Sequence, residues 1–134
     1  MFNGPKKPLK FKKTKKGKLV KLSFKNKLIF GTIGLKAAEA GILNSRQIES
    51  ARQSITRKTK RKAKIWIRIF PDLPITKKPT GVRMGKGKGQ ISHWGARVRG
   101  GTVLFEVCGT NFNLIITALK TAGTKLPIKT KIFQ

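Results

Sequence analysis

The clearest periodic pattern in the chain begins at Asn44. Ile48, Ala51 and Ile55 recur at the three- and four-residue spacing that places apolar side chains on one face of a helix. Asn44 suits the N-cap position, and Gln47, three residues later, can complete a capping box. The pattern therefore predicts a helix that starts after Asn44 and frays into the basic cluster that follows it.

A second helical pattern lies near the C-terminus. Its apolar face is formed by Ile115, Ala118, Leu119 and Ala122. Asn113 is the expected N-cap, and Gly123 stands where a left-handed residue at the C-cap is expected. We therefore expect a helix that packs one stripe against a core and ends before Pro127.

Three segments have the apolar content or the two-residue alternation of strands. Residues 28–35 are apolar with two glycines and suit a short strand or bulged ribbon. Residues 64–70 alternate in a way that predicts a strand covered at least partly on both faces and ended by Pro71. Residues 128–133 alternate again and predict a final strand.

The remaining segments predict a loop and a hairpin. Residues 72–79 follow one proline and contain two more, so we expect a rigid extended loop rather than a strand. Residues 94–98 and 103–107 alternate on either side of Gly100 and Gly101, which predicts a β-hairpin. Together these elements predict an α+β fold in which two helices pack on an antiparallel or mixed sheet.

The net charge of the chain indicates what kind of partner it binds. The 134 residues include 32 Lys and Arg against 4 Asp and Glu, which gives a net charge of +28. Self-repulsion on this scale destabilises a lone compact chain, whereas each cation brought to a phosphate releases counterions and adds affinity. A nucleic acid is therefore the expected partner, and a merely soluble basic protein is the alternative.

An unbroken basic stretch precedes the first acidic residue, Glu39. Such a run cannot bury itself. We expect residues 1–26 to form an extended basic arm that orders against phosphates, and residues 27–134 to form a single domain; a disordered tail without a fixed partner is the alternative. The arm residues expected to contact RNA are Lys6, Lys7, Lys10, Lys12, Lys13, Lys15, Lys16 and Lys18.

A glycine-rich segment is the second candidate for phosphate binding. Residues 83–89 are RMGKGKG, with lysines between the glycines. Glycine lets the backbone approach another chain closely, and lysine supplies point charges for phosphate. A Walker nucleotide loop needs a Ser or Thr after its lysine and a helix next, and neither is expected here. The pattern favours an RNA-contacting loop, and a nucleotide hydrolase is the alternative from the enzyme class.

Residue types that usually carry catalysis or bind metals are sparse. One histidine and one cysteine cannot supply the spacing of a zinc site. Glu49 is expected to pair with Arg46 or Arg52 along the first helix, and Glu106 is the least explained acidic residue. No apolar run approaches the ~20 residues of a membrane-spanning helix. We therefore expect no enzyme activity, metal, cofactor, small-molecule substrate or membrane partner.

Several sequence blocks occur in the order and spacing of a known family. The most specific are KIWIRIFPD at 64–72, PIT at 74–76 and RMGKGKG at 83–89. The likeness extends upstream through RQIE at 46–49 and downstream through KLPIKT at 125–130. With these blocks the chain resembles the bacterial and organellar large-subunit ribosomal protein sixteen family over nearly its whole length.

The resemblance implies a domain bound to large-subunit rRNA at the base of the central protuberance, where A-site tRNA is accommodated. It implies positioning rather than bond chemistry, neighbouring ribosomal proteins as contacts, and late incorporation during subunit assembly. The loop at 83–89 would reach towards the peptidyl-transferase centre, and Arg83 matches an arginine that some bacteria hydroxylate.

Composition and resemblance also suggest a compartment. The chain is rich in Lys, Ile, Phe and Asn and has no tyrosine, which looks like translation from an A+T-rich organellar genome. Residues 94–98 and 104–107 look more like mitochondrial than plastid members of the family. We therefore expect a mitochondrial ribosome, with a plastid or a bacterial cytoplasm as the alternative.

The residues outside the arm that are expected to contact RNA come from the first helix, the strands and the glycine-rich loop. They are Arg46, Arg52, Arg57, Arg61, Arg68, Arg83, Met84, Lys86, Lys88, His93 and Arg97.

Overall fold

Two sheets and two helices organise the chain in the computed structural model, which describes residues 5, 13–15, 17, 19 and 27–134. The described elements are β1 (Ile33–Ala37), β2 (Gly41–Asn44), α1 (Ser45–Lys58), β3 (Lys64–Ile67), β4 (Leu73–Lys77), β5 (Gln90–Val98), β6 (Val103–Cys108), α2 (Phe112–Gly123) and β7 (Thr130–Phe133). One sheet has the order β3-β6-β1-β7 and the other β2-β5-β4, with antiparallel pairing throughout. The expected α+β class is confirmed.

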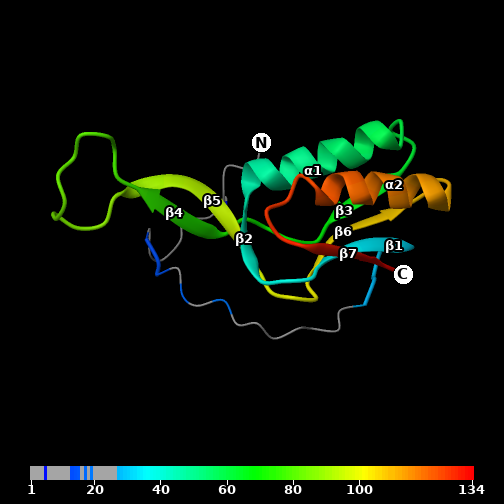
Figure 1. Ribbon diagram of the computed structural model, residues 1–134, viewed down its shortest axis with the longest axis horizontal. Coiled ribbons are helices and arrows are strands. Elements are labelled where there is room, and N and C mark those ends of the chain that lie inside the picture. The colour runs from blue at the N-terminus through cyan, green and yellow to red at the C-terminus, as the bar shows by residue number, and fades with distance from the viewer. Residues whose placement is uncertain (1–4, 6–12, 16, 18, 20–26) are drawn as a thin grey trace.

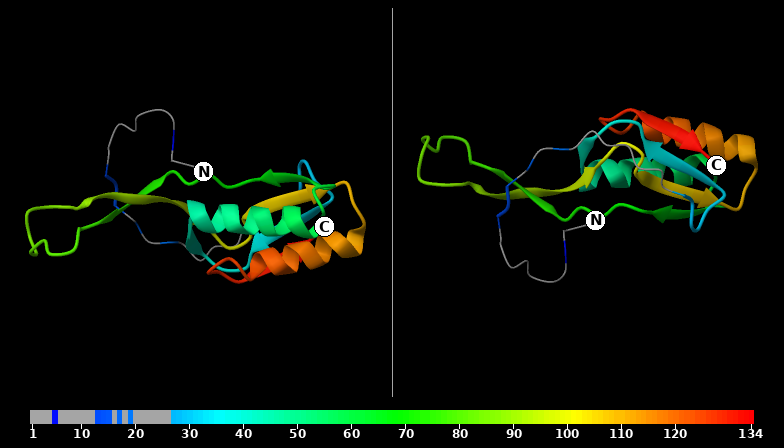
Figure 2. Two further views of the ribbon diagram at one scale, coloured as in Figure 1. Left: turned by 90° about the horizontal axis from the view of Figure 1, so that it is seen from above. Right: turned by 90° about the horizontal axis from the view of Figure 1, so that it is seen from below.

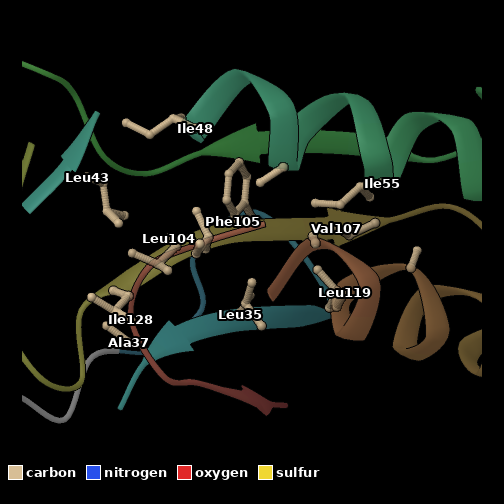
Figure 3. Packing of buried hydrophobic residues seen from close by; sticks show 14 of the residues in the cluster. Leu35, Ala37, Leu43, Ile48, Ile55, Leu104, Phe105, Val107, Leu119 and Ile128 are labelled. Atoms are coloured by element: carbon tan, nitrogen blue, oxygen red, sulfur yellow. The ribbon is translucent and has the colours of Figure 1, made fainter. Parts of the chain in front are cut away.

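Both helices lie on the same side of the four-stranded sheet (Figure 1). The core fills the space between them and the sheet, and Figure 3 shows Phe105 pointing from β6 towards α1. Ile48, Ala51 and Ile55 are fully buried on α1, as their spacing predicts. The four apolar residues predicted to share a face of α2 are also buried.

The start of α1 agrees with the sequence. Asn44 is the N-cap, and its N–H donates to Gln47 Oε1 at 2.9 Å, so the expected capping box is formed. The helix ends at Lys58, inside the basic cluster, where Thr59 is buried and its hydroxyl donates to Ile55 O at 3.0 Å. Local hydrogen bonding therefore defines both ends of this helix.

The ends of α2 differ from expectation. Asn111, not Asn113, is the N-cap, because the helical hydrogen bonds begin earlier, with Ile115 N–H donating to Asn111 O at 3.1 Å. Gly123 is the last helical residue rather than a left-handed cap, and Thr124 at the C-cap has a φ of −67°. The glycine instead allows close packing, since a Cβ there would lie 2.6 Å from Thr130 Oγ1.

The proline-rich segment is a strand, which corrects the expected loop at residues 72–79. β4 lies at the edge of its sheet and pairs only with β5, with Pro74 opposite Trp94. Proline cannot donate a backbone hydrogen bond, but an edge strand has one side on which no partner needs that donor. The loop therefore starts only after β4 and occupies residues 78–89.

The hairpin predicted across Gly100 and Gly101 is wrong, although both of its strands exist. β5 and β6 belong to different sheets, and β6 already has β1 and β3 as its two neighbours. The chain turns a corner there: Gly101, with a φ of +84°, donates its N–H to Ala37 O at 2.7 Å. The hairpin of the fold is instead formed by β4 and β5.

The other three expected strands are present but shorter than predicted. The apolar run at 28–35 enters the sheet only at Ile33, the alternating run from Lys64 pairs as a strand as far as Ile67, and the last strand begins at Thr130. The apolar pattern therefore located each strand but overestimated its paired length.

We expect Ile55→Ala to lower the free energy of unfolding by about 2–5 kcal/mol, because it leaves a cavity beneath α1. Gln53→Ala, on the exposed face of the same helix, is the matched control and should change stability by less than about 0.5 kcal/mol. Urea unfolding followed by circular dichroism measures both variants. Equal effects would contradict the assignment of the buried face.

Candidate nucleic-acid interface

The glycine-rich loop lies at the tip of the β4–β5 hairpin. Residues 78–89 project from the rest of the molecule (Figure 1). Met84 is 95% exposed, and Lys78 Nζ donates to Gly85 O at 2.5 Å across the loop. The loop joins two strands, so it lacks the following helix that a Walker loop uses to bind phosphates. Its exposed backbone and lysines can instead follow the backbone of a larger polyanion.

Described residues of the arm cross this hairpin and are bonded to it. Lys13 Nζ donates to Lys88 O at 2.7 Å, and Lys88 Nζ donates to Thr14 O at 2.5 Å. Arg97 Nη2 donates to Lys15 O at 2.7 Å, and Figure 2 shows the blue arm segment against the hairpin. We call the resulting basic region the hairpin surface, and its cations are Lys13, Lys15, Arg83, Lys86, Lys88 and Arg97.

A buried carboxylate fixes the segment that connects the arm to the domain. Glu106 is 0% exposed, and its Oε2 accepts the N–H groups of Ile29, Phe30 and Gly31 at 3.1, 2.7 and 2.9 Å. Its Oε1 accepts a hydrogen bond from Arg68 Nη1. We call this arrangement the root clamp. Because its three N–H donors are consecutive, the clamp fixes the direction in which the chain approaches β1.

The root clamp favours the charged form of Glu106. Burial by itself raises the pKa of Glu106, but the three backbone donors and the Arg68 guanidinium outweigh burial and hold that pKa below its ordinary value. A carboxylate that accepts several N–H bonds and pairs with arginine remains ionised at neutral pH. The clamp is therefore a charged interaction inside the fold.

The arginines of the first helix do not join the hairpin surface. Arg46 is exposed near the start of α1, Arg57 is exposed in its last turn, and Arg61 is exposed just beyond it. The C-terminal end of α1 lies on the far side of the domain from the hairpin loop (Figure 1). Arg52 donates to Glu49 Oε1 at 2.6 Å, and this hydrogen bond lowers the pKa of Glu49 against the opposing effect of burial. Of the two expected partners of Glu49, the structure selects Arg52.

Two other predicted RNA contacts have hydrogen-bond partners within the chain. Arg68 is bonded to Glu106, and His93 is half-buried on β5 with Nδ1 3.3 Å from Ser92 Oγ. Six of the predicted arm contacts lie outside the described residues. They are Lys6, Lys7, Lys10, Lys12, Lys16 and Lys18.

An open groove of about 740 Å³ lies beside the crossing of arm and hairpin. Arg68, Arg97 and Thr14 line it, together with Asp72. Both guanidinium groups are bonded within the chain, and the carboxylate of Asp72 adds the opposite charge. The groove is therefore a weaker candidate for phosphate than the exposed loop.

The described residues contain neither a cluster of metal-binding side chains nor a helix that could span a membrane. Among them, no group of three or more His, Cys, Asp or Glu side chains is placed to hold a metal ion. In the same part of the chain, no helix is long and apolar enough to cross a membrane.

Sequence reasoning missed the role of Glu106. The available signal was its position in β6, where Phe105 and Val107 flank it and the neighbouring strand residues are apolar. A lone carboxylate in such a strand must be paired and hydrogen-bonded when buried. The sequence did not reveal its three backbone partners, which lie about 75 residues away in the chain.

Comparison with known protein families shows which family the chain belongs to. The model of the family described as ribosomal protein L16p/L10e matches residues 5–133. The chain belongs to this family. The L16p/L10e match includes β4, β5, the hairpin loop and Glu106, so it covers both the hairpin surface and the root clamp.

Bacterial L16p/L10e relatives are similar over most of their length. The protein named large ribosomal subunit protein uL16 of Buchnera aphidicola subsp. Baizongia pistaciae is 54% identical over 121 residues, covering 90% of this chain and 89% of that protein. Its counterpart in Buchnera aphidicola subsp. Cinara cedri is 52% identical over 124 residues, covering 92% and 91%. That of Borrelia recurrentis is 50% identical over 123 residues, covering 91% and 89%. The resemblance inferred from the sequence blocks is confirmed.

We expect Glu106→Gln to weaken the root clamp. The free energy of unfolding of the variant should also fall less than that of the wild type as the pH is lowered. A carboxylate whose pKa is lowered by folding stabilises the fold above its unfolded pKa of about 4.3, and this contribution is lost as the pH falls through the folded value. Removal of the charge should cost about 3–5 kcal/mol at neutral pH and less in acid. Denaturant unfolding between neutral pH and strong acid measures this.

Glu49→Gln is the control for this experiment. Its pair with Arg52 is partly exposed and screened by water, so the loss of stability at neutral pH should be smaller. If acid lowers the free energy of unfolding of Glu106→Gln as steeply as that of the wild type, the root clamp would be contradicted.

Proposed function

We propose that this chain is a structural constituent of the large ribosomal subunit, where it binds large-subunit rRNA and catalyses no reaction. The observation that carries the proposal is the hairpin surface, in which an exposed loop and a crossing arm gather cations at one end of the molecule. Family membership supplies the ribosome as the setting.

Phosphate neutralisation is the physical basis of the proposed binding. Each Lys or Arg that meets a phosphate releases condensed counterions, so the net charge of +28 becomes affinity for a folded RNA. Arg83, Lys86 and Lys88 stand on a loop whose residues 80–88 are all exposed. We propose that residues 1–26 act as an arm along the rRNA and that residues 27–134 form the domain that holds the hairpin surface.

The arginines of α1 and its C-terminal end would meet a different part of the rRNA. Arg57 and Arg61 are exposed at and just beyond the C-terminal end of α1, which lies on the far side of the domain from the hairpin loop, so we expect a separate RNA segment to contact them. We propose that the domain sits between two RNA segments and contacts neighbouring ribosomal proteins. Met84 and His93 are proposed as further contacts because they share the hairpin.

The finer proposal concerns the hairpin loop and tRNA. Family resemblance supports a position of residues 83–89 near A-site tRNA and the peptidyl-transferase centre. The projection of this loop from the domain is compatible with such reach (Figure 1). The contribution would be positioning, since the loop carries cations and glycines but no general acid or base.

We also propose a compartment for this chain. Composition and resemblance suggested a mitochondrial ribosome, with a plastid or a bacterial cytoplasm as the alternative, and the relatives described above are bacterial. Detection of the chain in large subunits purified from isolated mitochondria would support the mitochondrial proposal, and detection only in cytoplasmic subunits would reject it.

A competition assay tests the proposed function. The full chain is offered a folded large-subunit rRNA fragment and a DNA duplex with the same number of phosphates over a range of salt. We expect preference for the rRNA fragment, with log affinity falling by about 0.7 to 0.9 per phosphate neutralised for each unit of log salt. Equal affinity for both polymers would favour a general nucleic-acid-compacting protein and would overturn the proposal.

Arg83→Ala should leave the fold and subunit association intact but slow peptide synthesis several-fold. Arg83 is exposed at the hairpin loop, so its loss should change the free energy of unfolding by less than about 0.5 kcal/mol. Subunits reconstituted with the variant are tested in a translation assay beside Lys125→Ala, an exposed cation outside the proposed interface. Unfolding by Arg83→Ala, or equal rates for the two variants, would contradict the role of the loop.

A further inference from the structure

A second surface, separate from the hairpin loop, carries aromatic rings beside cations. β3 is an edge strand of the four-stranded sheet. Ile65 and Ile67 pack against the core, while Lys64 and Trp66 alternate with them on the opposite face. The helices cover the core side of the sheet, so Trp66 lies on the side that they leave open.

Phe30 completes this surface from a distant part of the chain. Its ring stacks beside Trp66 with centroids 6.1 Å apart and ring planes 19° apart. The two residues come together because the root clamp holds the N–H of Phe30 on Glu106, which lies opposite Trp66 in the β3–β6 pairing. We call Phe30, Trp66 and Lys64 the aromatic surface.

Phe30 and its neighbour Ile29 are exposed beside Trp66, which is half-buried, and this exposure is costly for a chain alone in water. Phe30 is 55% exposed and its neighbour Ile29 is 66% exposed, although both backbones are fixed by Glu106. Apolar side chains exposed next to one another mark interaction sites, whereas single exposed apolar side chains are ordinary. The clamp therefore presents the ring of Phe30 rather than leaving it on a loose segment.

Two cations flank the rings, and of these only Arg68 forms an ion pair within the described part of the chain. Arg68 Cζ lies 5.2 Å from the centroid of Phe30, and its guanidinium is bonded to Glu106. Lys64 Nζ lies 5.1 Å from the centroid of Trp66, and within the described part of the chain it makes no ion pair. A flexible lysine beside an aromatic face can move to a phosphate when another ring takes its place.

We propose that the aromatic surface is a stacking site for an unpaired base of the bound RNA, with Lys64 on the adjoining phosphate. The inference rests on the proposed rRNA binding and names a subsite of it. The ligand must be unpaired, because a duplex hides its base faces, whereas splayed bases stack on aromatic side chains. Stacking on a ring is tolerant of base identity, so the site recognises single-stranded RNA rather than one sequence.

Charge favours RNA over an apolar protein partner. A protein that buried the rings of Phe30 and Trp66 would also have to desolvate Lys64 and supply a carboxylate for it. A nucleotide supplies the ring and the anion together. An occupant with both features therefore fits this surface better than an apolar helix would.

The test compares two RNAs of equal phosphate number, a single strand without self-complementarity and a duplex. Phe30→Leu and Trp66→Leu in the full chain should weaken binding to the single strand by about tenfold, the size of one lost stacking contact, and leave duplex binding unchanged. Phe112→Leu is the matched control, since Phe112 is 50% exposed at the start of α2 and should bind both RNAs as the wild type does. Circular dichroism verifies that each variant is folded.

A spectroscopic measurement does not depend on variants of the surface itself. The chain has two tryptophans, so Trp94→Phe leaves Trp66 as the only one. We expect the single strand to quench its fluorescence and the duplex to bind without quenching, because only an unpaired base stacks on the indole.

The outcomes separate this inference from the function on which it rests. Failure of the wild type to prefer folded rRNA would overturn the proposed function. Wild-type preference for rRNA, combined with unchanged single-strand affinity in Phe30→Leu and Trp66→Leu and no quenching, would overturn the stacking site alone. Variants that bind both RNAs normally but fail to join the large subunit would assign the surface to a protein neighbour and would also overturn it.

Discussion

The imbalance between 32 basic and 4 acidic residues is the constraint on which the rest of the structure depends. Three of the carboxylates are used inside the chain: Glu106 in the root clamp, Glu49 on Arg52, and Glu39 on the N–H of Lys129 at 2.8 Å. Internal pairing therefore leaves most of the cations for an external partner. A polyanion that lies along the surface relieves self-repulsion of this size.

The most buried carboxylate connects the core to the interface. Glu106 belongs to a central strand of the four-stranded sheet, yet its partners are the backbone that leads to the arm and Arg68 just beyond β3. The backbone lies close because Gly31 has no side chain, and a Cβ there would lie 2.8 Å from Val107 N. One interaction thus sets the course of the chain towards the arm and presents Phe30 beside Trp66. The core and the proposed RNA-binding surfaces are built together.

Sequence reasoning located the elements better than their partners. The buried face of α1 follows from the local periodicity of apolar residues, and its capping box follows from Asn44 and Gln47. Both were predictable. The pairing of β5 with β4 was not, because alternation shows that a segment is a strand but not which edge it meets, and Pro74 is tolerated only at an edge. The candidate loop was identified from its glycines and lysines. Its contact with Lys13 depends on long-range geometry that no local pattern contains.

The central claim is that a folded RNA neutralises the cations of this chain, and a lysine acetylation footprint tests it most directly. The free chain and the chain in native large subunits are treated with the same reagent, and the modification of each lysine is measured by mass spectrometry. The account predicts strong protection in the subunit at Lys13, Lys86 and Lys88, which are all exposed in the free chain. Equal modification of these lysines in both states would contradict it.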